Sequence, residues 1–155
     1  MDDVSVSMRD ELPAAVIRST SPMSELGQRL GEILPAVYAA IAGQGRTATL
    51  PPFVRYLDMN MEDSTLDFEA GFAVDAPITE AMPVQPAVVP GGEVASLWHV
   101  GPYQELGASH ERLDAWIAAQ GRQQGDGRWE VYWTDPGEEP DPAKWRTEVL
   151  QVLAP

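Results

Sequence analysis

Hydrophobic positions along the chain form two blocks of similar design. Apolar residues recur at helical spacing from Leu26 to Ile41 and again from Leu106 to Ile117. Shorter segments in which apolar residues concentrate are typical of strands, and they lie at residues 14–19, 52–58, 66–74, 93–99, 129–134 and 145–153. The pattern therefore predicts the order strand, helix, strand, strand, and predicts it twice.

A short sequence match supports this repetition. Pro22–Gly27 (PMSELG) returns eighty positions later as Pro102–Gly107 (PYQELG). After the helices, Gly45-Arg46 matches Gly121-Arg122 at a smaller offset, so the first helix should be about one turn longer than the second. We predict one α+β domain over residues 1–155, with a pseudo-two-fold tandem repeat, an antiparallel sheet and two main helices. The repeats would cover residues 4–76 and 89–154, with a linker at 77–88.

Local signals refine the first block. Ser21 followed by Pro22 indicates a helix N-cap and first helical position, and Pro35 should bend or interrupt that helix. Residues 1–11 show no clear pattern, and the segment from Pro77 to Pro90 carries four prolines and is expected to be a linker.

Composition narrows the class of protein. The formal net charge of −14 disfavours direct DNA binding, which needs basic side chains against phosphate, and favours cationic ligands or a basic protein partner. The same charge can also serve solubility alone. The chain has no Cys, no apolar run of membrane-spanning length and an acidic N-terminus, so we expect a cytoplasmic protein without membrane contact.

No catalytic motif is present, and neither a nucleotide-binding loop nor a cofactor fingerprint occurs. His99 and His110 lack carboxylates at metal-ligand spacing, and His110 lies on the apolar face of the second helix, where a core role is expected. We therefore expect no cofactor and no metal site.

Alternation along the last strand points to Glu148. It shares a face with Arg146, Leu150 and Val152. In the equivalent strand of the first half, residues 66–74, the apolar face should pack on a helix, and the repeat equates the opposite face with that of Glu148. Glu148 should thus point away from the helices, among apolar neighbours, where a bound cation would balance its charge. The alternative is a surface glutamate, or one paired with Arg146 or Arg55. On the equivalent face Gly71 lacks a side chain and could leave room for a ligand.

Aromatic residues suggest the walls of a binding site, since such rings stack on flat ligands and on cations. Tyr56 and Tyr132 occupy equivalent strand positions, and Tyr103 opens the second helix, where it can face a cleft between the halves. Five tryptophans all lie in the second half: Trp98, Trp116, Trp129, Trp133 and Trp145. For Trp129 and Trp145 a core role is favoured.

Several stretches together resemble the GyrI-like small-molecule-binding domain family. They are His99–Tyr103 (HVGPY), Pro52–Tyr56, Trp129–Tyr132, Trp145–Val149 and Asp67–Val74, and the similarity extends from about Val4 to Leu153. It implies tandem strand–helix–strand–strand modules and an aromatic-lined ligand cleft between them, with a central acidic residue on the last strand. That residue falls on Glu148. The chain carries no helix-turn-helix segment, which favours a stand-alone role over the regulator arrangement.

The leading hypothesis is a binding protein for amphipathic, often cationic, aromatic small molecules. Its candidate ligand-binding residues are Glu148, Tyr132, Tyr103, Trp98, Tyr56, Leu150, Gly71 and Trp133. The resemblance leaves two alternatives open. One is a hydrolase that opens cyclopropane-bearing electrophiles with Glu148 as general base and Tyr103 or Tyr132 as hydrogen-bond donor. The other is a gyrase-inhibitor-like role, in which an acidic loop at residues 135–141, otherwise a solvated turn, meets a protein partner.

Overall fold

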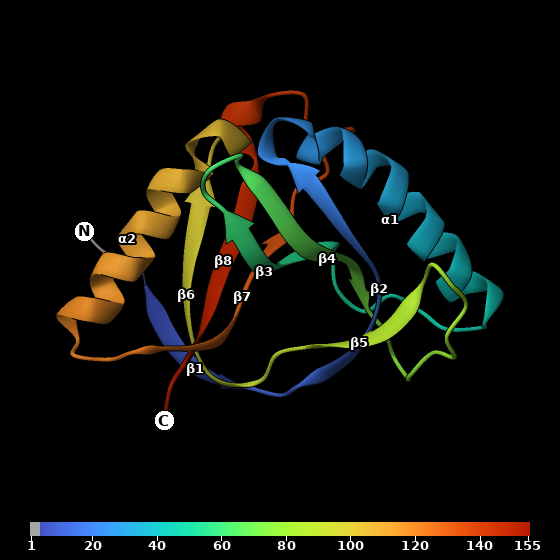
Figure 1. Ribbon diagram of the computed structural model, residues 1–155, viewed down its shortest axis with the longest axis horizontal. Coiled ribbons are helices and arrows are strands. Elements are labelled where there is room, and N and C mark those ends of the chain that lie inside the picture. The colour runs from blue at the N-terminus through green and yellow to red at the C-terminus, as the bar shows by residue number, and fades with distance from the viewer. Residues whose placement is uncertain (1–3) are drawn as a thin grey trace. The chain divides into compact units, whose positions relative to one another are not determined.

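The structure, a computed structural model, describes residues 4–155, and these form two compact units. Unit N spans Glu11–Pro90, and unit C joins residues 4–10 to Gly91–Pro155. Each unit contains one long helix and four antiparallel strands (Figure 1). The predicted α+β class, with antiparallel sheet and two main helices, is confirmed.

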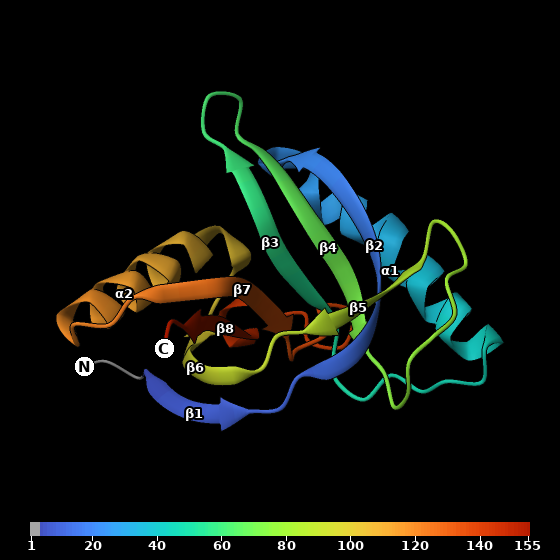
Figure 2. The ribbon, with the colours of Figure 1, turned by 60° about the horizontal axis from the view of Figure 1, so that its bottom comes forward.

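In unit N the chain forms β2 (Leu12–Pro22), α1 (Leu26–Gly43), β3 (Phe53–Asn60), β4 (Thr65–Ala73) and β5 (Gln85–Val89). The strand order is β3-β4-β2-β5, and the β3–β4 hairpin is a long ribbon in Figure 2. On α1 the buried residues are Ile33, Val37 and Ile41, which belong to the predicted apolar face. The ring of Phe72 on β4 meets Tyr38 of α1 edge-on, with centroids 5.6 Å apart, so the apolar face of β4 packs on the helix as expected.

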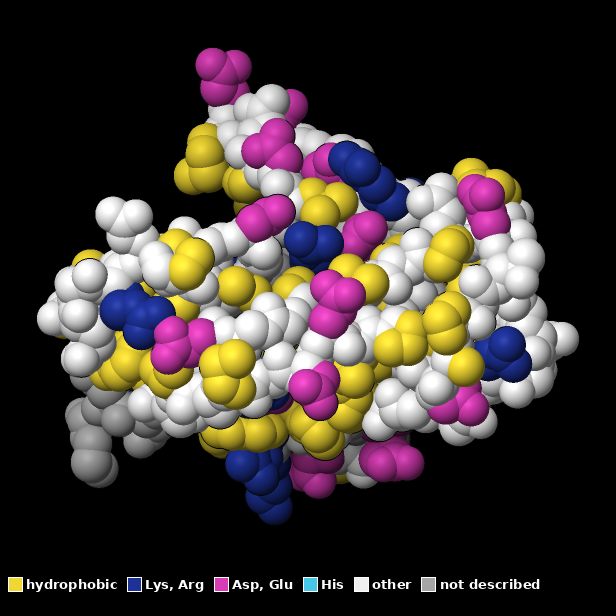
Figure 3. Space-filling model, turned by 90° about the horizontal axis from the view of Figure 1, so that it is seen from below, with side chains coloured by type: hydrophobic (Ala, Val, Ile, Leu, Met, Phe, Trp, Pro, Cys, Tyr) yellow, Lys and Arg dark blue, Asp and Glu magenta, His cyan; other side chains and the backbone are white. Residues whose placement is uncertain are grey.

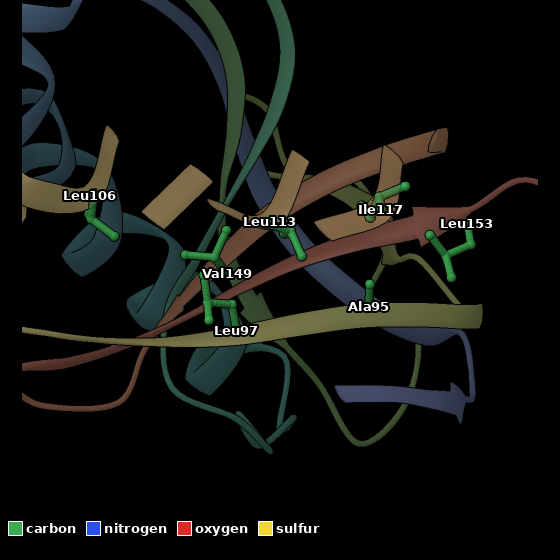
Figure 4. Packing of buried hydrophobic residues seen from close by; sticks show 7 residues of the cluster. All are labelled: Ala95, Leu97, Leu106, Leu113, Ile117, Val149 and Leu153. Atoms are coloured by element: carbon green, nitrogen blue, oxygen red, sulfur yellow. The ribbon is translucent and has the colours of Figure 1, made fainter. Parts of the chain in front are cut away.

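In unit C the chain forms β1 (Ser5–Arg9), β6 (Gly92–Val100), α2 (Leu106–Ala119), β7 (Gln124–Tyr132) and β8 (Arg146–Leu153). The strand order is β1-β6-β8-β7. Leu106, Leu113 and Ile117 of α2 pack on the sheet (Figure 4). The strand residues that they face are Ala95, Leu97, Val149 and Leu153.

Both helices follow the repeated sequence closely. A short 3-10 helix precedes each of them, Met23–Glu25 before α1 and Tyr103–Glu105 before α2, so both α-helices begin at the leucine of the repeated motif. The helices have 18 and 14 residues, which confirms the predicted difference of about one turn. The three principal strands of each unit also pair in the same order, although a pseudo-two-fold relation between the units stays a prediction.

Three local predictions differ from the structure. Ser21 is not the N-cap, because β2 continues to Pro22 and the Ser21 hydroxyl donates to the Pro22 carbonyl. Pro35 does not interrupt α1, which runs from Leu26 to Gly43. Two strands were missed: β1 lies in the segment without a clear pattern, and β5 lies inside the expected linker.

Each of the two missed strands pairs with a principal strand that is distant in sequence rather than with the one that follows it. β1 directly precedes β2 in sequence but pairs with β6, whereas β5 directly precedes β6 but pairs with β2. Figure 2 shows β1 beside β6. Each unit thus gains its fourth strand from the segment that leads into the other block of the sequence, and this brings Arg9 into unit C.

Candidate functional site

The sheet of unit C has two distinct faces, which the pairing register defines. Leu97 and Val149 are paired and pack on α2, so their alternate neighbours Trp98 and Glu148 point to the other side. We call these the helix side and the far side. The prediction that Glu148 points away from the helix layer is confirmed.

Glu148 is buried on the far side and already has partners. Its side chain is 6% exposed, and Arg9 of β1 donates from Nη2 to its Oε2 at 2.9 Å. The indole Nε1 of Trp133 donates to Oε1 at 3.2 Å. Paired with Glu148 in the ladder are Trp98 and Val131, and Leu150, two residues along β8, is also buried. The alternative of an arginine partner is therefore correct in kind, but the arginine is Arg9 rather than Arg146 or Arg55.

The Arg9–Glu148 ion pair links the edge strand β1 to β8, across β6, which lies between them. Arg9→Met should lower the free energy of unfolding by about 1 kcal/mol, because it leaves a buried carboxylate without its cation while partial exposure of Arg9 screens the pair. Chemical denaturation measures the change. Arg18→Met is the matched control: Arg18 pairs with Asp67 at 2.8 Å but its side chain is 59% exposed, so a change of less than about 0.5 kcal/mol is expected. Equal losses in the two variants would contradict a special role for the Arg9 pair.

Tryptophans and a second arginine border Glu148. The Trp98 and Trp133 rings are tilted, with centroids 5.9 Å apart, and the Arg146 guanidinium lies 4.7 Å from the centre of Trp98. Trp133 is 44% exposed. The cation–π contact on Trp98 is thus made by a side chain of the protein itself. Trp98, Trp133, Leu150 and Glu148 form the far-side part of the predicted site.

Tyr103 and Tyr132 lie elsewhere, on the helix side. Tyr132 is paired with Thr147, one residue before Glu148. The Tyr103 ring lies 5.7 Å from Tyr132 and 4.9 Å from Trp145, centroid to centroid. All three aromatic residues are partly exposed, and Trp145 is therefore not the core residue that the sequence favoured, whereas Trp129 is buried as expected. The Tyr103 ring also packs against the buried cluster between α2 and the sheet.

A second buried glutamate accompanies these rings. Glu130 is 1% exposed and accepts a hydrogen bond from the Tyr132 hydroxyl at 2.7 Å. His110 Nε2 contacts its other oxygen. Arg128, which can only donate, contacts His110 Nδ1 at 3.0 Å, so the imidazole is neutral and its Nε2–H donates to Glu130. We call Glu130, Tyr132, Tyr103 and Trp145 the helix-side cluster.

Outer contacts hold this network in place. Arg128 donates from Nε to Gln151 at 2.8 Å and from Nη2 to Asp114 of α2. Because Arg128 is fixed from both sides, the orientation of His110 and hence of the Glu130 carboxylate is set in advance. His110 is thus a hydrogen-bonded, half-buried residue, close to the core role expected for it.

The environment of Tyr103 keeps its hydroxyl protonated. Burial raises the pKa of Tyr103 above its ordinary value, and the negative charges of Glu130 and Asp135 raise it further. The folded state therefore holds this proton more tightly than the unfolded chain does. The resulting stability is present below the unfolded pKa of about 10 and is lost as pH rises through the folded pKa.

Tyr103→Phe should remove this alkaline dependence. In denaturation experiments between about pH 8 and 11, the native protein should lose more stability above about pH 10 than the variant. The comparison with the variant isolates Tyr103 from the other tyrosines. Parallel pH curves for the two proteins would contradict the raised pKa.

Two predicted ligand residues belong to unit N. Tyr56 is paired with Phe68 on the α1 side of its sheet, and Gly71 is paired with Val16 and Phe53. A Cβ on Gly71 would lie 1.9 Å from the carbonyl oxygen of Ala15, so the close approach of β2 gives this glycine a packing reason. A ligand role for the two residues stays a prediction.

Sequence reasoning divided the site differently and missed two residues. It placed Glu148 beside the tyrosines, whereas the structure puts Glu148 and the pair Tyr103 and Tyr132 on opposite faces of one sheet. Arg9 was missed because its strand was not predicted. Glu130 could have been found from alternation, since it lies two residues before Tyr132 on the same strand and so shares its face.

The acidic loop between β7 and β8 is accounted for locally. Asp135 accepts hydrogen bonds from the backbone of residues 137–139, and Asp141 accepts one from the Ala143 amide. In Figure 3, acidic side chains are scattered over the visible face rather than gathered into one patch. In residues 4–155, no group of three or more acidic or histidine side chains is suited to a metal ion. None of the helices described there is long and apolar enough to cross a membrane.

Similarity to known proteins decides the family. The family model of the GyrI-like small molecule binding domain matches residues 2–151. This chain belongs to the GyrI-like family. It is accordingly a small-molecule-binding domain, and the resemblance inferred from its motifs is confirmed. No curated protein is similar enough in sequence to match.

Solved structures of similar fold include EcmrR and its C-terminal domain. The C-terminal domain of EcmrR is 21% identical, with a TM-score of 0.86 over 99% of this GyrI-like chain and 98% of that domain. EcmrR in its complex with DNA is also 21% identical, with a TM-score of 0.85. That comparison covers 97% of this chain but only 57% of the EcmrR chain.

Two further neighbours are more distant. A hydrolase encoded by lin2189 from Listeria innocua is 14% identical, with a TM-score of 0.67 over 97% of this chain and 91% of that chain. SAV2435 bound to tetraphenylphosphonium is 9% identical, with a TM-score of 0.67 over 98% of this chain and 94% of that chain. At these identities the likeness concerns the fold.

Proposed function

We propose that this GyrI-like chain binds amphipathic, often cationic, aromatic small molecules, and that the helix-side cluster contacts them. The observation that carries the proposal is the placement of three partly exposed aromatic rings beside the buried carboxylate of Glu130. Aromatic faces stack on flat rings and attract cations, and a desolvated carboxylate attracts positive charge more strongly than one in water.

Two hydrogen bonds to Glu130 suit this role. The Tyr132 hydroxyl and the His110 imidazole each contact one oxygen of the carboxylate and so orient it. A ligand cation seated against the rings would be attracted by this carboxylate. The bound tetraphenylphosphonium of SAV2435, a cation surrounded by phenyl rings, is consistent with such chemistry in a protein of the same fold.

Glu148, the residue predicted from the sequence, is the competing centre. It also lies among aromatic rings, with Trp98 and Trp133, but Arg9 already supplies its cation. A cationic ligand would have to displace Arg9 and offset the free energy of breaking that pair. We assign the charge-reading role to Glu130 because the Tyr103, Tyr132 and Trp145 rings lie on its face of the sheet, and variants of both glutamates distinguish the two.

The binding experiment is a fluorescence titration with a planar cationic dye and with an uncharged dye of the same shape. Micromolar affinity for the cation and at least tenfold weaker binding of the neutral dye is the expected result. Equal affinities for the two dyes would contradict a charge-reading carboxylate. Absence of binding to either would contradict the proposal as a whole.

A hydrolase is the second candidate, and one observation favours it: Tyr132 and Tyr103 lie beside Glu130 with their hydroxyls protonated or donating. Glu130 would take a proton from water as the oxygen bonds to a carbon of a strained ring. The ring bond breaks, and a tyrosine hydroxyl stabilises the electron pair that reaches the conjugated carbonyl. Product beyond one equivalent per protein from a cyclopropane-bearing electrophile would establish turnover, and a single equivalent or none would leave binding alone.

A further inference from the structure

Tyr103 follows directly after a turn that several hydrogen bonds stabilise. The turn leads from the end of β6 into the 3-10 helix Tyr103–Glu105. Gly101 has a φ of +134°, a conformation that favours glycine. Its amide donates to the Trp145 carbonyl at 2.8 Å, and the Pro102 carbonyl accepts from the Glu105 amide at 3.1 Å. The turn that presents Tyr103 is therefore bonded to the same residue against which the Tyr103 ring packs.

His99 is the buried side chain that closes this turn. It is 5% exposed, at the end of β6, and its Nε2 lies 3.0 Å from the Pro102 carbonyl oxygen. A carbonyl can only accept, so Nε2 carries the proton and donates. Nδ1 lies 2.7 Å from the Ser109 hydroxyl oxygen on α2. Ser109, 2% exposed, in turn accepts from Arg112 at 3.3 Å. Both ring nitrogens are thus used, Nε2 on the turn and Nδ1 on α2.

The other unit shows what is particular about His99. Eighty positions earlier, Ser19 stands at the place of His99 and Arg29 at the place of Ser109, and Arg29 donates to the Ser19 hydroxyl at 2.5 Å. Both units therefore tie the end of the first strand to the helix. In unit N the Pro22 carbonyl accepts the hydroxyl of Ser21, and the place of Tyr103 is taken by Met23. The imidazole that joins strand, helix and turn belongs to the unit that carries the aromatic cluster.

We propose that His99 is a positioning residue that holds the Tyr103 turn in the conformation needed to recognise the ligand. It acts through the Pro102 carbonyl and makes no contact with the ligand. By fixing Pro102, it fixes the start of the 3-10 helix and with it the Tyr103 ring against Trp145 and Tyr132. The effect on affinity rests on the proposed function, whereas the effect on the turn does not.

Two substitutions separate the bonds of His99. The amide nitrogen of glutamine occupies about the position of Nε2, so His99→Gln can still donate to Pro102. His99→Asn reaches only the position of Nδ1, and it keeps a partner for Ser109 while it loses the bond to the turn. The readouts are amide hydrogen exchange at Gly101 and Glu105, and affinity for the cationic dye, measured on the chain of residues 1–155.

His99→Asn should speed exchange at these two amides at least tenfold and weaken dye binding about fivefold, and His99→Gln should restore both to within about twofold of the native protein. Native exchange in the Asn variant, or no rescue by Gln, would overturn the proposal. Fast exchange with unchanged affinity would keep the clamp on the turn but refute Tyr103 as a ligand contact, which is a failure of the proposed function. If His99→Asn does not fold, Ser109→Ala tests the same clamp from its other end, and unchanged exchange at Gly101 would overturn it.

Discussion

Glu130→Gln is expected to weaken binding of a planar cationic dye about thirtyfold, which corresponds to ~2 kcal/mol. The substitution removes the charge and keeps the shape. The carbonyl of the introduced amide would accept from His110, and its NH₂ group would donate to the Tyr132 oxygen, because a hydroxyl can reverse its role. The fold should therefore survive, and the loss should be specific to cations. A fluorescence titration with native and variant protein measures it.

Glu148→Gln is the matched control for this experiment. Both glutamates are buried on adjacent strands, but Glu148 pairs with Arg9 and lies on the opposite face from Tyr132. The control should change dye affinity by less than about threefold and should instead lower stability. The uncharged dye should bind both variants as it binds the native protein. If Glu148→Gln gives the larger loss for the cation, the centre predicted from the resemblance is correct and the assignment to Glu130 fails.

The helices and principal strands could be predicted because their signals are local. The apolar stripe of each helix and the repeated ELG sequence mark the same boundary in both units. The edge strands could not, because β1 (SVSMR) and β5 (QPAVV) have only five residues and little alternation of their own. Such strands are defined by the neighbour with which they pair, and that pairing is not written in their own sequence.

The candidate site was predictable in its residue types more than in its grouping. Alternation placed Glu148 on the correct face of β8. Tyr132, however, is paired with Thr147, the neighbour of Glu148, and therefore lies on the opposite face. The register between β7 and β8 decides this, and the sequence did not reveal that register. The partner of Glu148 depended on β1. The partners of Glu130 depended on α2, because His110 reaches it from the helix. Contacts between elements far apart in sequence therefore decided both carboxylate environments.

Gly71→Ala is expected to lower the free energy of unfolding by more than about 3 kcal/mol. The new Cβ would lie 1.9 Å from the Ala15 oxygen and 2.9 Å from the Ala15 carbonyl carbon and Val16 Cα, all of them backbone atoms. Ala15 and Val16 are fully buried in β2, so the clash can be relieved only by a shift of a core strand. Urea denaturation measures the loss.

Gly27→Ala provides the control for the same chemical change. A Cβ at Gly27 meets nothing within 4 Å, and this position lies in α1, where alanine is favoured over glycine by about 0.5–1 kcal/mol. This variant should be slightly more stable than the native protein. A Gly71→Ala variant with native stability but weakened dye binding would show that the glycine leaves room for a ligand, as the sequence suggested. Loss of stability alone assigns Gly71 to the close approach of β2 and β4, and limits the ligand contacts proposed above to unit C.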